Sequence, residues 1–129
     1  MRKDRFVSKQ DAIFTERELD VMDILWQDGS GTVSDVKERI SDDLAYTTVL
    51  TILRTLEQKG FVGHQPEGRA YRYHPLVGKE EARESHLRRL TRKLFGGSRE
   101  LLMAQLVSDG DLTREELERL RNMLDQRLG

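Results

Sequence analysis

The spacing of apolar residues changes along this chain, and this change most restricts the folds open to it. Up to about residue 59, apolar side chains recur at the three- and four-residue spacing typical of helices. Residues 61–65 and 70–74 are two short strand-like runs, and Pro66-Glu67-Gly68-Arg69 between them is typical of a turn. From Lys79 onward the helical spacing returns. The pattern predicts a mainly α chain with one small β-hairpin.

Three helices are expected before the hairpin. Thr15 and Thr32 each precede an acidic residue by three positions, the spacing of a capping box, and so predict helices over residues 16–27 and just after residue 32. A third helix is expected over residues 45–59, with Gly60 as its C-terminal cap. Three helices and a hairpin in this order are typical of a winged helix-turn-helix domain, which we place at residues 11–77.

Length and composition narrow the function classes. The chain has 129 residues, enough for one domain or two very small ones. It contains no cysteine, which excludes disulfides, thiolate metal sites and cysteine nucleophiles, and fits a reduced cytoplasmic location. The longest apolar run, Leu101–Ala104, is too short to cross a membrane. We expect no membrane insertion and no cofactor.

The formal net charge of −1 conceals a regional pattern. Residues 1–10 carry four basic and one acidic side chain, and we expect them to form a flexible basic arm. Residues 11–45 carry three basic and ten acidic groups, whereas residues 46–75 carry four basic and two acidic groups. Salt screens each charge beyond about 10 Å, so a local basic face on a nearly neutral chain can still bind phosphate. Ordinary surface charge would give the same sums.

The third expected helix has two different faces. Val49, Ile52, Leu53 and Leu56 gather on one side and should face the core. The opposite side is almost free of acid, and short hydroxyl groups with one guanidinium suit contact with base edges and phosphates in a DNA major groove. The candidate groove contacts on this helix are Thr47, Thr48, Thr51, Arg54 and Thr55, and Tyr46 is expected at the helix start, beside a phosphate.

The hairpin supplies two further candidate DNA contacts. Arg69 follows the turn glycine, where a wing would reach the DNA backbone or a minor groove, and Arg72 lies three residues later. Strand alternation places Tyr71 and Tyr73 on one side of the hairpin and Arg72 with His74 on the other.

Residues 78–129 are expected to be all-helical, with a further capping box at Thr113 and Glu116, and to form a dimerisation domain. About fifty residues in three short helices make a poor core on their own, whereas two copies packed together would bury their leucines. A twofold dimer would also present two recognition helices one DNA turn apart, which predicts a palindromic operator. The alternative is packing of these helices back onto the winged domain. The candidate dimer residues are Leu94, Leu101, Leu102, Leu106, Leu117, Leu120 and Leu124.

Two other function classes compete with DNA binding. A winged helix can serve as a protein-interaction module, which would bind DNA weakly and without sequence preference. An enzyme would need converging ionisable groups, but the three histidines have no metal-ligand spacing, and no phosphate-binding or nucleophile motif is present. We therefore expect no catalytic residue and no metal site.

Several stretches together resemble the penicillinase repressor family, which also includes methicillin-resistance regulators and copper-transport repressors. They span about residues 13–128 and continue through Phe95-Gly96-Gly97 and Leu112-Thr113 to Leu120-Arg121-Asn122-Met123-Leu124. The main ones are Leu19-Asp20-Val21-Met22-Asp23-Ile24-Leu25-Trp26, Thr48-Val49-Leu50-Thr51-Ile52-Leu53-Arg54-Thr55-Leu56 with Lys59-Gly60-Phe61, and Tyr71-Arg72-Tyr73-His74-Pro75-Leu76-Val77.

The resemblance implies a homodimeric winged-helix repressor that reads an inverted-repeat operator in double-stranded DNA. In the antibiotic-resistance members, a membrane-linked sensor leads to proteolytic cutting of the dimerisation domain, and the bivalent grip on DNA is lost. Those relatives are cut at an Asn-Phe bond near the position of Ala104–Leu106, whereas the one asparagine here is Asn122, followed by Met123. The Cys-x-Cys motifs of the copper-sensing branch are also absent.

The start of the recognition helix departs from the family as well. Ala45-Tyr46-Thr47 stands where some relatives have Ser-Pro-Lys, and Leu50 stands where some carry arginine. These positions lie on the helix expected to enter the groove, so an operator sequence does not transfer from one relative to this chain.

Overall fold

A computed structural model describes residues 12–129; the expected basic arm at residues 1–10 lies outside this range. The chain divides into two compact units inside one helix, between Leu87 and Arg88. The first unit therefore keeps the beginning of that helix, while the functional division expected after residue 77 stays a prediction. None of the helices within residues 12–129 is both long and apolar enough to cross a lipid bilayer.

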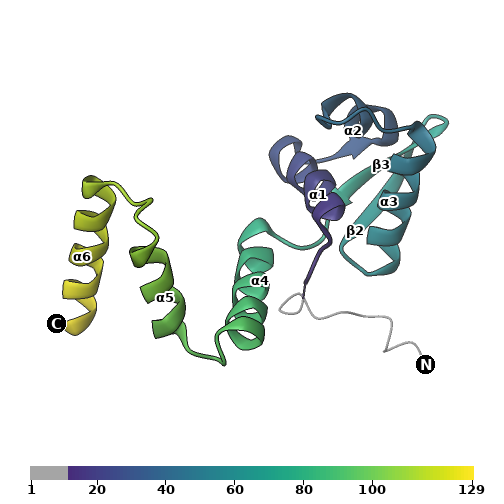
Figure 1. The fold of residues 1–129 in the computed structure, drawn as a ribbon. Coiled ribbons are helices and arrows are strands. Elements are labelled where there is room, and N and C mark those ends of the chain that lie inside the picture. The colour runs from purple at the N-terminus through teal and green to yellow at the C-terminus, as the bar shows by residue number, and fades with distance from the viewer. Residues whose placement is uncertain (1–11) are drawn as a thin grey trace. The chain divides into compact units, whose positions relative to one another are not determined.

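The first unit contains helices α1 (Glu16–Asp28), α2 (Val33–Arg39) and α3 (Tyr46–Gln58), followed by strands β2 (Val62–Glu67) and β3 (Ala70–Pro75) (Figure 1). Helix α4 (Lys79–Leu94) begins in this unit. Both expected capping boxes are present: the hydroxyl of Thr15 accepts from the amide of Glu18, and that of Thr32 from the amide of Asp35. The predicted winged helix-turn-helix order is thus confirmed.

A third strand, β1 (Gly31–Thr32), was not expected from the sequence. It pairs antiparallel with β3, and the sheet order is β1-β3-β2. Two residues are too few to show an alternating pattern, so the strand is recognised by the pairing of Gly31 with Tyr73 and of Thr32 with Arg72. The strand ties the start of α2 to the wing.

The turn of the hairpin is tighter than the four-residue segment expected. Strand β2 continues through Pro66 to Glu67, which pairs with Ala70, so that Gly68 and Arg69 alone form the turn. Gly68 adopts a φ of +63°, a conformation that glycine tolerates at low steric cost. Pro66 has no amide proton to donate. It is tolerated because β2 lies at the edge of the sheet, where one side of the strand has no neighbouring strand to bond with.

The core of the first unit lies between the helices and the sheet. Helix α3 contributes the predicted face, with Val49, Leu53 and Leu56 at 0% exposure. Apolar burial of this kind is the main term favouring the fold. The core also includes Val21, Met22 and Leu25 from α1, Val36 from α2, and Phe61, Val62, Tyr73 and Val77 from the hairpin and its flanks.

An aromatic cluster fixes the start of α4 to α1. The ring of Phe14 lies 4.6 Å from Phe61 and 6.1 Å from Trp26 between centroids. The indole Nε1–H of Trp26 donates to the carbonyl of Val77 at 2.8 Å, and the amide of Phe14 donates to His86 Nε2 at 3.1 Å. The chain that leaves the wing is therefore held against the first helix rather than forming a free linker.

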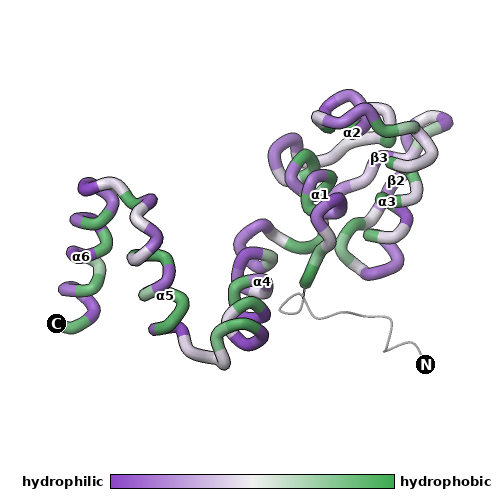
Figure 2. Tube along the Cα trace, in the orientation of Figure 1, coloured by the Kyte–Doolittle hydropathy of each residue, from purple (hydrophilic) through white to green (hydrophobic). Residues whose placement is uncertain are grey.

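The second unit holds the end of α4 with α5 (Arg99–Ser108) and α6 (Arg114–Leu128), as the helical pattern predicted. The expected capping box at Thr113 is present. Among residues 88–129, Leu102 is the one buried apolar side chain. Apolar segments nevertheless run along both helices (Figure 2). This unit therefore leaves most of its leucines in solvent.

Candidate nucleic-acid interface

The outer face of α3 is polar, open and free of carboxylates in its first turn. Thr47, Thr48, Thr51 and Arg54 are exposed, and Thr55 is half-buried. Tyr46 begins the helix with 47% of its surface exposed. The five predicted groove residues Thr47, Thr48, Thr51, Arg54 and Thr55 thus lie on the side of the helix away from its buried residues, while Tyr46 lies at the helix start.

The first turn of α3 has amide donors without a side-chain acceptor. Its N-cap is Ala45, which makes no side-chain capping bond, in contrast to the capping threonines of α1 and α2. Helix N-termini carry a partial positive charge and bind anions such as phosphate. Tyr46 and Thr47 lie beside these donors, so this end of the helix suits a backbone phosphate.

The candidate arginines differ in what already engages them. Within residues 12–129, neither Arg54 nor Arg69 takes part in an ion pair, so both guanidinium groups are open to a ligand. Arg72 instead binds both carboxylate oxygens of Glu67, at 2.6 and 2.9 Å. Its Nη1 also donates to Ser30 Oγ at 3.2 Å, and Asp35 lies 3.5 Å away.

Through these contacts Arg72 links the wing to the start of α2. The hydrogen bonds from Arg72 lower the pKa of Glu67, and Glu67 in turn raises the pKa of the guanidinium. A charged group already paired in two directions has less to gain from a phosphate than a free one. The sequence showed the arginine but not its partners, because Ser30 and Asp35 lie about forty residues away.

A second cluster joins the wing to α3, and sequence reasoning did not identify it. His64 Nδ1 on β2 lies 2.6 Å from Glu57 Oε2 near the end of α3. The same imidazole packs against Tyr71 at 4.4 Å and Tyr73 at 5.6 Å between ring centroids. Burial, and then the nearby Glu57, raise the pKa of the Tyr73 phenol, while Arg54 opposes this. No local spacing links Glu57 to His64, so the contact follows from the tertiary fold alone.

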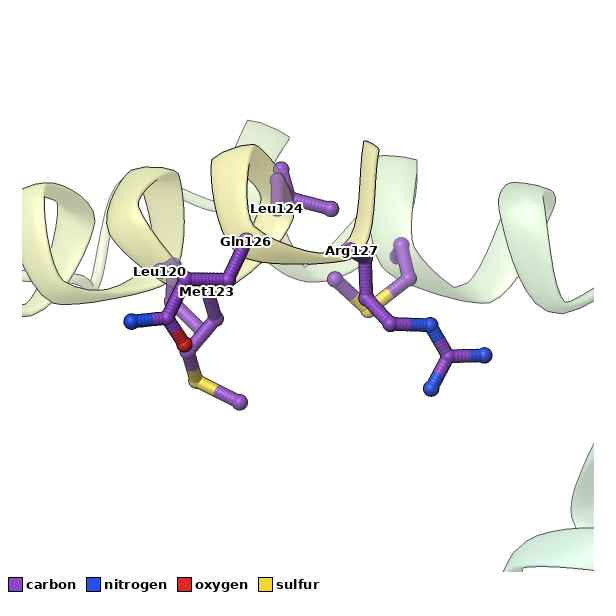
Figure 3. Close-up of a pocket in the computed structure, with 6 residues that line it drawn as sticks. Leu120, Met123, Leu124, Gln126 and Arg127 are labelled. Atoms are coloured by element: carbon purple, nitrogen blue, oxygen red, sulfur yellow. The ribbon is translucent and has the colours of Figure 1, made fainter. Parts of the chain in front are cut away.

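The candidate dimer residues lie mostly in solvent. Leu94, Leu101, Leu106, Leu117 and Leu124 are 41–73% exposed, whereas Leu102 is buried and Leu120 half-buried. Met103 of α5 and the α6 residues Leu120, Met123, Leu124, Gln126 and Arg127 line an apolar hollow of about 370 Å³ (Figure 3). Neighbouring exposed apolar side chains of this kind are typical of interaction sites.

A metal centre would need several histidine or carboxylate side chains to converge on one point. Across residues 12–129, no three histidine, aspartate or glutamate side chains gather closely enough to hold an ion.

Comparison with known proteins adds relatives of defined role. The chain is 26% identical over 112 residues to the methicillin resistance regulatory protein MecI of Staphylococcus aureus. The aligned region covers 85% of this chain and 91% of MecI. It is 45% identical over 64 residues to the transcriptional regulator BlaI of Mycobacterium tuberculosis, covering 47% and 46%. The crystal structure of oxidized MarR from Escherichia coli matches with a TM-score of 0.51 at 20% identity, covering 90% and 76%, which supports the winged-helix fold.

A family model, described as the penicillinase repressor, matches residues 14–126. This range includes the winged helix, α4, α5 and most of α6. The match extends over most of the chain, and it agrees with the fold and with the relatives above. The chain therefore belongs to the penicillinase repressor family.

Proposed function

We propose that this protein is a cytoplasmic transcriptional repressor that binds an inverted-repeat operator in double-stranded DNA as a homodimer. The observation that carries the proposal is the outer face of α3, where exposed threonines accompany Arg54, which forms no ion pair within residues 12–129. Threonine hydroxyls bond base edges or phosphates and their methyls pack on thymine, while an arginine reads guanine or binds phosphate. Helix α3 enters the major groove and Arg69 of the wing contacts the adjacent backbone.

Homodimerisation is supported by the second unit. A cluster of exposed leucines and methionines on α5 and α6 has no core of its own to pack into, and a second copy offers the same apolar surface in return. Bivalent binding then makes the second half-site contact intramolecular, which raises overall affinity by orders of magnitude. Repression ends when the C-terminal helices are cut or otherwise prevented from pairing.

The test begins with selection of duplexes from a random-sequence DNA pool by the purified full-length protein. We expect enrichment of a palindrome, binding of that palindrome well above random duplex, and a steep fall in affinity with salt because phosphate contacts release counterions. Sedimentation equilibrium at micromolar concentration should give a dimer. Weak binding without sequence preference would favour the protein-interaction module, and a monomer would refute the bivalent arrangement.

A further inference from the structure

The two faces of β3 have different surroundings, and this decides which wing residue can meet DNA. Arg72 points to the side where Ser30 and Asp35 lie, at the start of α2. Tyr71 and Tyr73 lie on the other side, against His64, which is itself joined to Glu57 of α3. The tyrosine face of the wing is therefore the one adjoining the recognition helix, where β2 runs beside α3 (Figure 1).

Tyr71 is the outer member of this face. Tyr73 is 2% exposed and belongs to the core, whereas Tyr71, two residues closer to the turn, is 50% exposed. The imidazole of His64 packs against the Tyr71 ring in a tilted arrangement, with 4.4 Å between the ring centroids. Among residues 12–129 its hydroxyl has no hydrogen-bond partner, so both an apolar ring edge and a free donor are available to a ligand.

We propose that Tyr71 contacts the DNA backbone beside the groove occupied by α3, and that the Glu57–His64 pair positions its ring. This inference rests on the proposed function. A phenol hydroxyl donates to phosphate oxygens, and its ring packs on the sugar, so the contact fixes register without reading bases. Tyr71 takes the wing role expected for Arg72, whose guanidinium is held by Glu67.

The positioning part follows from how the wing is attached. Only the short turn through Lys59–Phe61 connects α3 to β2, so side-chain contacts must set the angle between them. Glu57 and His64 span that angle with one 2.6 Å contact, and the other face of the imidazole supports Tyr71. Because Val62 and Tyr73 keep the base of the hairpin in the core, loss of the pair would leave the wing folded and would release only its outer part, which carries Tyr71.

The experiment uses full-length protein and the palindromic duplex that the wild type selects from a random pool. Tyr71→Phe should weaken binding about tenfold through loss of one charge-assisted hydrogen bond, and Tyr71→Ala by more. Neither removes a cation, so the dependence of affinity on salt should keep its slope. Arg39→Ala, which breaks an exposed pair with Asp28 on α1, is the matched control and should bind as wild type.

A double-mutant cycle tests the positioning part. His64→Gln alone should weaken operator binding several-fold, but should add little in the Tyr71→Ala background because the group it positions is already gone. Thermal unfolding of each variant reports on folding separately. Because Tyr71→Phe removes only a solvent-exposed hydroxyl, it keeps the test valid if the alanine variant unfolds.

Three outcomes would overturn the inference. Wild-type affinity in both Tyr71 variants would remove this side chain from the interface, and full additivity of His64→Gln with Tyr71→Ala would refute positioning through the ring. A changed salt slope in Tyr71→Phe would point to a displaced cation instead. If the wild-type protein selects no palindrome at all, the proposed function fails first, which distinguishes the two failures.

Discussion

The proposed dimer makes a strong prediction for Leu124→Asp. Leu124 lies on α6, beside the apolar hollow, and 54% of its surface is exposed in the protomer. Complete burial of a leucine side chain contributes about 1.5–3 kcal/mol, so covering the exposed half contributes about 1 kcal/mol per copy. Burial of an aspartate carboxylate in its place costs at least about 2 kcal/mol more.

Because the dimer is twofold symmetric, the substitution is present in both copies and each of these free-energy changes applies twice. The variant dimer should therefore be weaker by about 6 kcal/mol, which corresponds to about ten-thousand-fold in the dissociation constant. A dimer that is stable at nanomolar concentration would then dissociate at micromolar concentration. Operator affinity should fall with it, because each half-site would be bound by a single winged domain.

Sedimentation equilibrium at micromolar concentration measures the dimer directly, and operator binding is measured in parallel. Asn122→Asp is the matched control, since it adds the same charge to the same helix at an exposed position on the opposite side. Circular dichroism checks that both variants stay helical. A Leu124→Asp protein that remains dimeric would falsify the placement of this face in the interface.

Three further predictions concern the winged domain. Arg54→Gln should weaken operator binding by about 1–3 kcal/mol if Arg54 reads a base, or reduce the salt slope by about one if it contacts a phosphate. Arg72→Gln should chiefly lower the unfolding temperature. Equal losses of operator affinity in the two variants would refute the assignment of Arg54 to DNA and of Arg72 to the fold. Thr48→Ala should raise the free energy of unfolding by about 0.5 kcal/mol yet weaken operator binding, which urea denaturation and gel shifts would separate. The backbone amide and hydroxyl of Thr32 lower the pKa of Asp35 from its ordinary 3.8, so its contribution to stability is present above that pH and lost on further acidification. Thermal unfolding of Asp35→Asn between pH 5 and pH 2 should accordingly show a shallower dependence than wild type.

Local patterns in the sequence were enough to locate the helices and the hairpin. The three capping boxes predicted the starts of α1, α2 and α6, because a hydroxyl and a carboxylate three residues apart satisfy amides in the same turn. Helical periodicity predicted the buried face of α3, and the positions left on the other side of the helix formed its polar face. These features depend on neighbours within four residues.

The roles of the wing side chains could not be found in that way. Arg72 carried the charge that a DNA contact needs, but its pairing with Ser30 and Asp35 depends on how β1 returns to β3. The two-residue strand β1 left no periodic trace, since pairing rather than composition defines it.

The sequence by itself determined the helices and the two strands of the hairpin, and which face of each is apolar, because these depend on short-range hydrogen bonding and side-chain spacing. Only the tertiary structure decided that Arg72 faces α2 while Tyr71 faces the recognition helix with His64 and Glu57. A strand presents its residues alternately to two sides, and the elements that occupy each side come from distant parts of the chain. The physical environment of a side chain is therefore set by packing, even where its identity and direction are set locally.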